Sequence, residues 1–151
     1  MSDEKIPKLI KGGLSVDDRG RVGFVNEFNF MNEEIKRFYF IENHNKGFIR
    51  AWHGHKVEAK YVLAVKGSSL VCCVKIDDWN SPSKDAKVWR FVLSDTQPSI
   101  LYIPEGYANG HMSLNDDTLI MVFSNQTIDV GLKDDIRFES HYWNPWHVEE
   151  R

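Results

Sequence analysis

The sequence has little cysteine, and this shortage excludes one class of protein. Only two of the 151 residues are cysteines, too few for the disulfide framework of a small secreted domain. They are neighbours, Cys72 and Cys73, in an apolar run where successive strand side chains point to opposite faces. We therefore expect both to be reduced packing residues.

Long apolar runs and basic blocks are also absent. No stretch approaches the ~20 apolar residues that span a bilayer, and the opening MSDEKIPKLIKGG lacks the apolar centre of a signal peptide. The 19 Lys and Arg residues are balanced by 22 Asp and Glu residues, and no basic run is interleaved with aromatics, which argues against nucleic-acid binding. We expect a cytoplasmic protein whose partner is a small molecule or another protein.

No long stretch has a helical period, and no repeat or linker divides the chain. Hydrophobic residues make up 42% and aromatics 13%, enough for one well-buried core and little more. Short runs rich in β-branched and aromatic residues recur instead, separated by turn signals: Arg37–Ile41, Gly47–Trp52, Tyr61–Val65, Ser69–Ile76, Val88–Leu93, Ile100–Ile103 and Thr118–Phe123. This spacing predicts an antiparallel sandwich or closed barrel, one domain over residues 1–151 with flexible ends.

The segment from residue 47 to residue 67 is the most informative. It resembles the first motif of the cupin family, a Gly, five residues, His-x-His, a Glu a few residues on and, six residues later, a Gly. Gly47, His53, His55 and Gly67 fall in register, and Lys60 stands in place of the Glu. The resemblance implies an all-β cupin fold, a double-stranded β-helix or jelly-roll barrel.

The second cupin motif, Pro-x-Gly-x-x-His, is matched by Pro104 and Gly106, with Asn109 in place of the His. In metal-binding cupins the two histidines, the Glu and this last His hold a first-row metal, and each ligand must present a lone pair. A protonated Lys60 has none. Although His53-x-His55 could recruit Zn²⁺ with outside help, we expect no metal and no cofactor.

Further segments resemble the dTDP-4-dehydrorhamnose 3,5-epimerase family of cupins, in the same order and over about residues 12 to 125. They are Asp18–Gly20, Glu42–His44, Ile49–His53, Lys60–Gly67 and Ile103–Gly110. The run from His53 to Lys56 also resembles the related dTDP-sugar 3,4-ketoisomerases, which are shorter cupins closer to this chain in length.

This resemblance implies an isomerase of a nucleotide-linked 4-keto-6-deoxy sugar. The C4 carbonyl acidifies the protons on C3 and C5, so a base of near-neutral pKa can remove one. His53 is the candidate base, with His55 beside it, and Lys60 would stabilise the enolate. Arg19 and Arg50 are candidates for binding the diphosphate.

Asn109 and His111 complete the candidate substrate-binding set. Trp52, Tyr107 and Phe24 could stack on a nucleobase, although a core position suits each of them equally well.

Three features depart from the epimerase pattern. The Tyr that serves as the far-side acid is replaced by Val122 or Phe123, so Tyr39 is our first choice for that role, with Tyr107 and His111 behind it. The C-terminal Asp that supports the catalytic His has no clear counterpart among Asp134, Asp135 and Glu139. Arg50 and His53 are three apart, so both can line one cavity only if their strand is bulged.

Three functions stay open at this point. The first is an epimerase acting at C3, C5 or both, and the second is a 3,4-ketoisomerase. The third is a non-catalytic cupin that binds a sugar nucleotide or a partner protein. We also expect a homodimer, because related cupins pair through an N-terminal strand, with the Arg19 segment reaching the partner's cavity.

Overall fold

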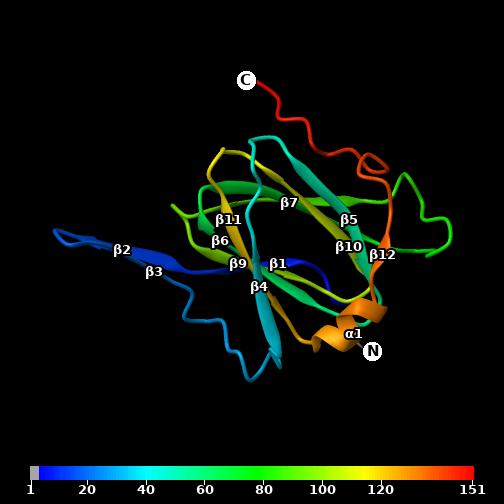
Figure 1. Ribbon diagram of the computed structural model, residues 1–151, viewed down its shortest axis with the longest axis horizontal. Helices are drawn as coiled ribbons and strands as arrows, with labels where there is room; N and C mark the ends of the chain where they lie inside the picture. Colours follow the sequence, from blue (N-terminus) through cyan, green and yellow to red (C-terminus); the bar gives the residue numbers. More distant parts are fainter. Residues whose placement is uncertain (1–3) are drawn as a thin grey trace.

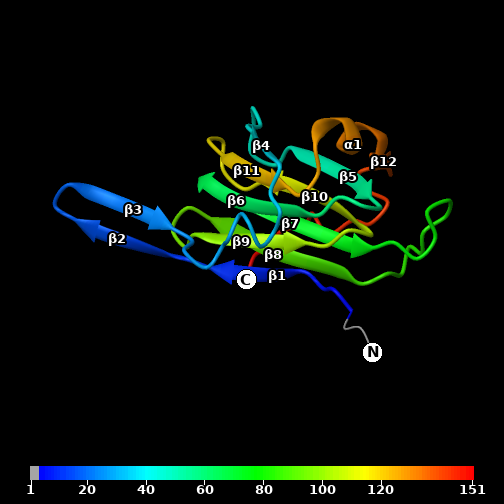
Figure 2. The ribbon, with the colours of Figure 1, turned by 90° about the horizontal axis from the view of Figure 1, so that it is seen from below.

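The computed structural model describes residues 4–151, which form two five-stranded antiparallel sheets that face each other (Figures 1 and 2). One sheet has the order β1-β9-β6-β11-β4 and the other β12-β5-β10-β7-β8, while β2 and β3 form a separate hairpin. The strands are β1 Lys8–Lys11, β2 Gly13–Asp17, β3 Gly20–Phe24, β4 Arg37–Ile41, β5 Ile49–His55, β6 Lys60–Lys66, β7 Ser68–Lys75, β8 Val88–Ser94, β9 Ser99–Ile103, β10 Tyr107–Ser113, β11 Leu119–Ser124 and β12 Ile136–Arg137. The helix α1 spans Ile128–Lys133.

All seven runs predicted from the sequence are strands, and the predicted all-β architecture is confirmed. The prediction missed β10, whose sequence YANGHMS is too polar to read as a strand. It also missed the short strands β1 and β12 and the hairpin β2–β3. Within residues 4–151, no helix has the length and apolar character needed to cross a membrane.

The space between the sheets is filled from both sides by alternate residues of each strand. The inner core includes Val62, Val71, Cys73, Leu101 and Val122. Because side chains alternate along a strand, the neighbouring residues point outward, and a second set lies on the far face of the β5-β10-β7 sheet. This outer cluster contains Cys72, Leu70 and Trp52, and the C-terminal segment covers it with Trp143 and Trp146.

The two cysteines thus lie on opposite faces of β7, as predicted, and both are free thiols. Burial raises the pKa of the Cys72 thiol to about 12. A group that holds its proton so firmly is a poor nucleophile at neutral pH, which fits a packing role.

Strand β5 carries the predicted bulge. Where β5 pairs with β10, Asn109 lies opposite His53 and His111 lies opposite Arg50. The two pairs are three residues apart on β5 but only two apart on β10. The peptide bond between Ala51 and Trp52 is cis. Because of the bulge, Arg50 and His53 both face the inside of the barrel, although a regular strand would place them on opposite faces.

The bulge depends on a glycine on the neighbouring strand. A Cβ at Gly110 would lie 2.4 Å from the Cβ of Ala51 and 3.0 Å from the carbonyl oxygen of Arg50. We predict that Gly110→Ala lowers the free energy of unfolding by about 1–3 kcal/mol, the usual cost of overpacking, as measured by urea denaturation. Gly23→Ala is the control, because its Cβ would meet Leu14 and Pro98 at 3.4 Å, an ordinary contact. Equal stability of the two variants would show that the close approach is unimportant.

Candidate active site

A cavity of about 270 Å³ opens between the two sheets. Its aliphatic lining consists of Ile41, Val62, Val71, Ile120 and Val122. Its polar lining consists of Arg37, Tyr39, Arg50, His53, His55, Glu58, Lys60, Asn109, His111 and Asp135. Helix α1 forms part of the rim through Ile128, Gly131 and Leu132. A largely apolar cavity with a few convergent polar groups is the usual form of a small-molecule site.

His55 is held in one tautomer. Its Nδ1 lies 2.6 Å from the carbonyl oxygen of Asp134, and a carbonyl can only accept a hydrogen bond, so Nδ1 carries the proton. The remaining ring nitrogen, Nε2, therefore has a free lone pair. Burial lowers the pKa of His55, the charge of Lys60 lowers it further, and the Asp134 carbonyl and Glu58 partly oppose them. His55 is accordingly a neutral base at pH 7.

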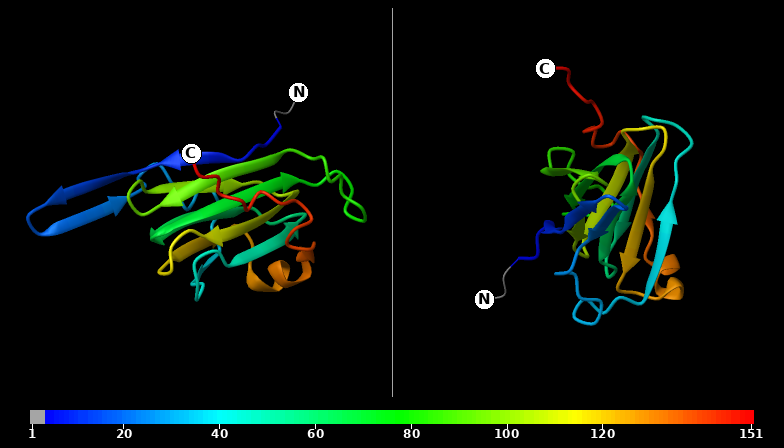
Figure 3. Two further views of the ribbon diagram at one scale, coloured as in Figure 1. Left: turned by 90° about the horizontal axis from the view of Figure 1, so that it is seen from above. Right: turned by 90° about the vertical axis from the view of Figure 1, so that its left-hand side faces the viewer.

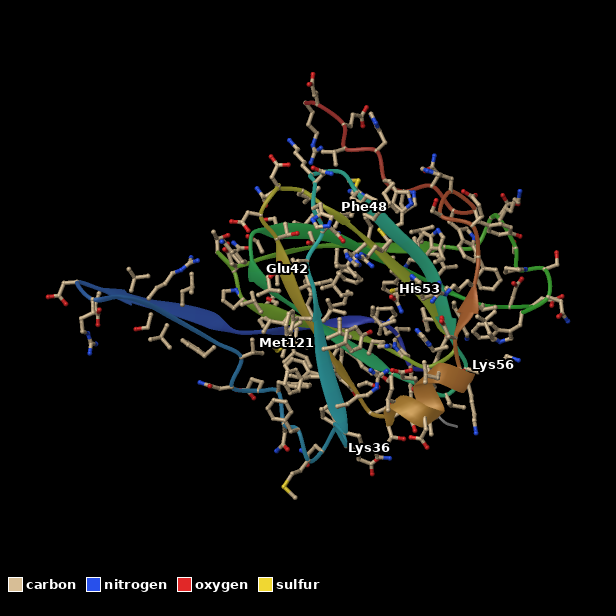
Figure 4. All side chains as sticks on the ribbon, viewed as in Figure 1. Lys36, Glu42, Phe48, His53, Lys56 and Met121 are labelled. Carbon is tan, nitrogen blue, oxygen red and sulfur yellow. The ribbon has the colours of Figure 1, made fainter. Side chains whose placement is uncertain are left out.

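His53 lies two residues earlier on β5 and also has an oxygen of an aspartate near its Nδ1. Its Nδ1 lies 3.7 Å from Oδ1 of Asp135, the carboxylate closest to it along the Asp134–Asp135 turn. Burial lowers the pKa of His53, and Asp135 opposes that effect. His53 is more exposed than His55, and on β5 it lies between Arg137 of β12 and Asn109 of β10 (Figure 4).

The side chain of Asp134 organises the turn that follows β5. Its two carboxylate oxygens accept the backbone N–H groups of Lys56, Val57 and Glu58 at 2.7, 2.9 and 2.9 Å. The carboxylate nearest to His53 is that of Asp135, at a distance longer than a hydrogen bond, while Asp134 serves His55 and the turn.

The sheet opposite the histidines contributes a chain of charged groups. Lys60 on β6 donates to the hydroxyl of Tyr39 on β4 at 2.7 Å. Its Nζ also lies 2.9 Å from Oε1 of Glu58, and the same oxygen accepts from Arg37 at 2.9 Å and from Ser124 at 2.7 Å. Burial raises the pKa of Glu58, but the hydrogen bonds from Lys60 and Ser124 outweigh it, so this pKa lies below its ordinary value.

A second polar network joins β5 and β10 through Asn43. Arg50 donates from Nε to Oδ1 of Asn43 at 2.6 Å. The amide nitrogen of Asn43 donates to Ser113 at 2.8 Å and lies 3.4 Å from Nε2 of His111. Burial lowers the pKa of His111 to about 4, with the positive charge of Arg50 adding to the effect. Asn43 thus links two predicted substrate-binding residues.

His55, Glu58 and Asp134 are close enough to be considered as metal ligands, since one ligand atom of each lies within 4.8 Å of the others. Their bonding does not suit a cation. Both oxygens of Asp134 accept backbone N–H groups, Oε1 of Glu58 is engaged by Arg37 and Ser124, and the neighbouring Lys60 ammonium would repel a metal ion.

The structure brings together seven of the eight predicted site residues. Tyr39, Arg50, His53, His55, Lys60, Asn109 and His111 all line the cavity. Arg19 does not: it is exposed at the tip of the β2–β3 hairpin and binds Asp17. Of the aromatic candidates, Trp52 and Tyr107 are buried in the core, and Phe24 is on the hairpin.

Sequence reasoning missed Arg37, Asn43 and Glu58. The spacing of Glu58 from Lys60 could have identified it. Residues two apart on a strand point to the same face, so Glu58 would share a face with Lys60 if the strand began before residue 60. Asn43 lies in a stretch that was singled out for its resemblance to the epimerases, and Arg37 gave no signal beyond its position at the start of a strand.

Solved structures with a similar fold include dTDP-4-dehydrorhamnose 3,5-epimerases. The enzyme from Sulfolobus tokodaii matches with a TM-score of 0.74 and 21% identity, over 91% of this chain and 80% of that one. The enzyme from Bacillus anthracis, solved with TDP and PPi, gives 0.73 and 20%, over 95% and 86%.

A sugar 3,4-ketoisomerase has the same fold. QdtA from Thermoanaerobacterium thermosaccharolyticum, solved in complex with TDP, matches with a TM-score of 0.67 and 22% identity over 90% of each chain. No match is found among curated proteins.

A barrel of two facing antiparallel sheets around a cavity is the architecture of a cupin, as the sequence predicted. The family model described as FdtA: WxcM-like, C-terminal, matches residues 3–144, and the chain belongs to this family.

The cavity histidines give a prediction about stability and pH. The folded-state pKa values of His53, His55 and His111 all lie below the ordinary 6.5, so the unfolded chain binds protons that the folded chain does not. The free energy of unfolding should be highest above pH 6.5 and fall as the pH decreases towards about 4. For His111 alone this amounts to roughly 3 kcal/mol.

Urea denaturation across this pH range measures the slope. His111→Gln should flatten it, whereas His147→Gln, a change of an exposed side chain outside the cavity, should not. A slope that is the same in both variants and in the unaltered protein would contradict the assignment.

Proposed function

We propose that the protein is a 3,4-ketoisomerase of a dTDP-linked 4-keto-6-deoxy sugar. The observation that carries the proposal is the pair of imidazoles on one face of β5, each with its own partner in the Asp134–Asp135 turn. The reaction moves hydrogen from C3 and its hydroxyl to C4 and its oxygen, so it is a net isomerisation that consumes no oxidant.

The two histidines suit the two kinds of proton transfer that this reaction needs. His53 removes the proton from C3 and returns it to C4, because a neutral imidazole is matched to a carbon acid beside a carbonyl. His55, with Nε2 free, exchanges protons with the neighbouring oxygens. Lys60 stabilises the negative charge that develops on O4.

One other observation supports this reaction over the epimerisation that the sequence favoured slightly. The cavity-facing residue of β11 is Val122, which cannot supply a proton, while Phe123 points to the opposite face of the sheet and contacts Phe28 and Phe30.

Epimerisation at C3 or C5 is the second candidate, and one contact favours it. Tyr39 lines the cavity from the sheet opposite His53, directly across the strand pair from Val122. Its hydroxyl accepts from Lys60, so its own proton is free for a ligand. An epimerase needs such a donor across the ring from its base.

The proposal predicts the product. Incubation with dTDP-, GDP- and CDP-linked 4-keto-6-deoxy sugars in D₂O, with and without chelator, should give a 3-keto sugar from the dTDP substrate in both cases, detected by NMR. His53→Asn should abolish turnover, and Lys60→Ala should bind substrate but lose on the order of 10² to 10³ in kcat. His147→Asn is the matched control.

Other products decide against the proposal in different ways. Inversion at C3 or C5 that is lost in Tyr39→Phe, with deuterium exchange retained, would establish the epimerase. Binding of the dTDP sugar without exchange or a new product would leave a non-catalytic sugar-nucleotide-binding cupin. Activity that is lost in chelator and restored by a metal would contradict the metal-free chemistry.

We also propose that two chains form a homodimer and that Arg19 serves the partner's cavity. The β2–β3 hairpin projects away from both sheets (Figures 1 and 3), and Val16 and Val22 on it are 71% and 65% exposed. An isolated two-stranded hairpin is marginally stable in water, so it gains from packing on a second chain.

Mixing two inactive variants tests this arrangement. Refolded mixtures of Arg19→Ala and His53→Asn chains should recover roughly a quarter of wild-type activity, because half of the dimers are mixed and each of those contains one intact site. Light scattering should show a dimer for each variant. A stable monomer with full activity, or no recovery in verified mixed dimers, would contradict the proposal.

A further inference from the structure

Glu58 is the cavity residue with the least expected position. It is 1% exposed, and its carboxylate lies among Arg37, Lys60 and Ser124. All three of these groups contact Oε1. The second oxygen, Oε2, has no hydrogen-bond partner and lies 3.8 Å from Nδ1 of His55. The reaction proposed above gives this carboxylate no role.

The contacts of Lys60 show what the carboxylate can do. An ammonium group has three N–H donors. One is donated to the hydroxyl of Tyr39 at 2.7 Å, and the ammonium forms an ion pair with Oε1 of Glu58 at 2.9 Å. These two fixed partners set the position of Nζ, and an N–H group remains for a ligand in the cavity that Lys60 lines.

The charges around His55 depend on the same carboxylate. The side chains that face His55 are His53 on the same strand, Lys60 on β6, Glu58 in the turn between β5 and β6, and Asp134 and Asp135 after α1. The carboxylate of Asp134 is engaged by the backbone of residues 56–58. Glu58 is therefore the anion that offsets both Lys60 and Arg37 on this side of the imidazole.

We propose that Glu58 is a positioning residue, which aims the free N–H of Lys60 at the ligand oxygen and supplies the negative charge that balances two cations beside His55. Its catalytic part rests on the proposed isomerase function, because it acts through Lys60 and His55. Its electrostatic part is independent of turnover.

Helix α1 adds a steric reason for the fixed position of the carboxylate. A Cβ at Gly131 would lie 2.8 Å from Nη2 of Arg37 and 3.2 Å from Oε2 of Glu58. The backbone of α1 therefore lies against the Arg37–Glu58 ion pair at Gly131, the helix residue that has no side chain. Glu58 is confined from this side as well as by its hydrogen bonds.

The test compares Glu58→Gln with Glu33→Gln. Both replace a carboxylate by an amide, but Glu33 binds Tyr61 outside the active-site cavity. Glu58→Gln should lower kcat on the order of 10²-fold, the cost of a misplaced catalytic group, with KM within a few-fold. Loss of the anion should also move the midpoint of His55 in an NMR titration to lower pH, by about one unit. Glu33→Gln should change neither quantity.

Glu58→Asp distinguishes the effect of the carboxylate's position from the effect of its charge. It also replaces Glu58→Gln as the test variant if Glu58→Gln does not fold. It keeps the charge but withdraws the carboxylate by one methylene, so kcat should fall while the His55 midpoint stays near that of the unaltered protein. Wild-type kcat in either folded Glu58 variant would overturn the positioning role. An unchanged His55 midpoint in Glu58→Gln would overturn the electrostatic role.

These outcomes are distinct from failure of the proposed function. If the unaltered protein converts no substrate, the isomerase proposal fails, and the NMR titration still decides whether Glu58 controls the charge at His55.

Discussion

The carboxylate of Asp134 is the constraint on which the rest of the site depends. It accepts three consecutive backbone N–H groups from the turn after β5, and the carbonyl of the same residue fixes the tautomer of His55. The neighbouring residue, Asp135, supports His53. One short stretch after α1 therefore positions both imidazoles and the turn that carries Glu58. Hydrogen bonds to a charged acceptor are worth about 1.5–3 kcal/mol each, enough to hold such a turn without regular secondary structure.

The two sheets contribute different kinds of chemical group to the cavity. The β5-β10 side supplies neutral bases, since burial lowers the pKa values of His53, His55 and His111. The β4-β6 side supplies fixed charge through Lys60, Arg37 and Glu58. A reaction that removes a proton from carbon and leaves charge on an adjacent oxygen needs a base on one side and a cation near the oxygen. The arrangement matches that need without a metal.

Much of this could be predicted from sequence, because the signals were local. The seven predicted strands were short runs rich in β-branched and aromatic residues, and the spacing from Gly47 to Gly67 located His53, His55 and Lys60. The three-residue separation of Arg50 and His53 required a bulge if both were to line one cavity, and β5 has one. Strand β10 escaped prediction because Asn109, Gly110 and His111 face a polar cavity or a close backbone contact rather than an apolar core.

The remaining parts depend on contacts between distant segments, which periodicity does not reveal. Asp134 lies 79 residues from His55 in the sequence, Asp135 is similarly far from His53, and two acidic neighbours in a loop are usually solvated. Glu58 resembles an ordinary charged turn residue until the fold buries it between Arg37 and Lys60. Arg19 lies outside the cavity of its own chain, and its predicted role in substrate binding depends on a second chain.

The central claim is that His53 transfers hydrogen from C3 to C4 on one face of the sugar, and a substrate deuterated at C3 tests it most directly. NMR of the product formed in H₂O should show a 3-keto sugar that retains part of the deuterium at C4, together with a primary isotope effect on kcat/KM. A product that is still a 4-ketone, with C3 or C5 inverted and the deuterium replaced from water, would contradict the account.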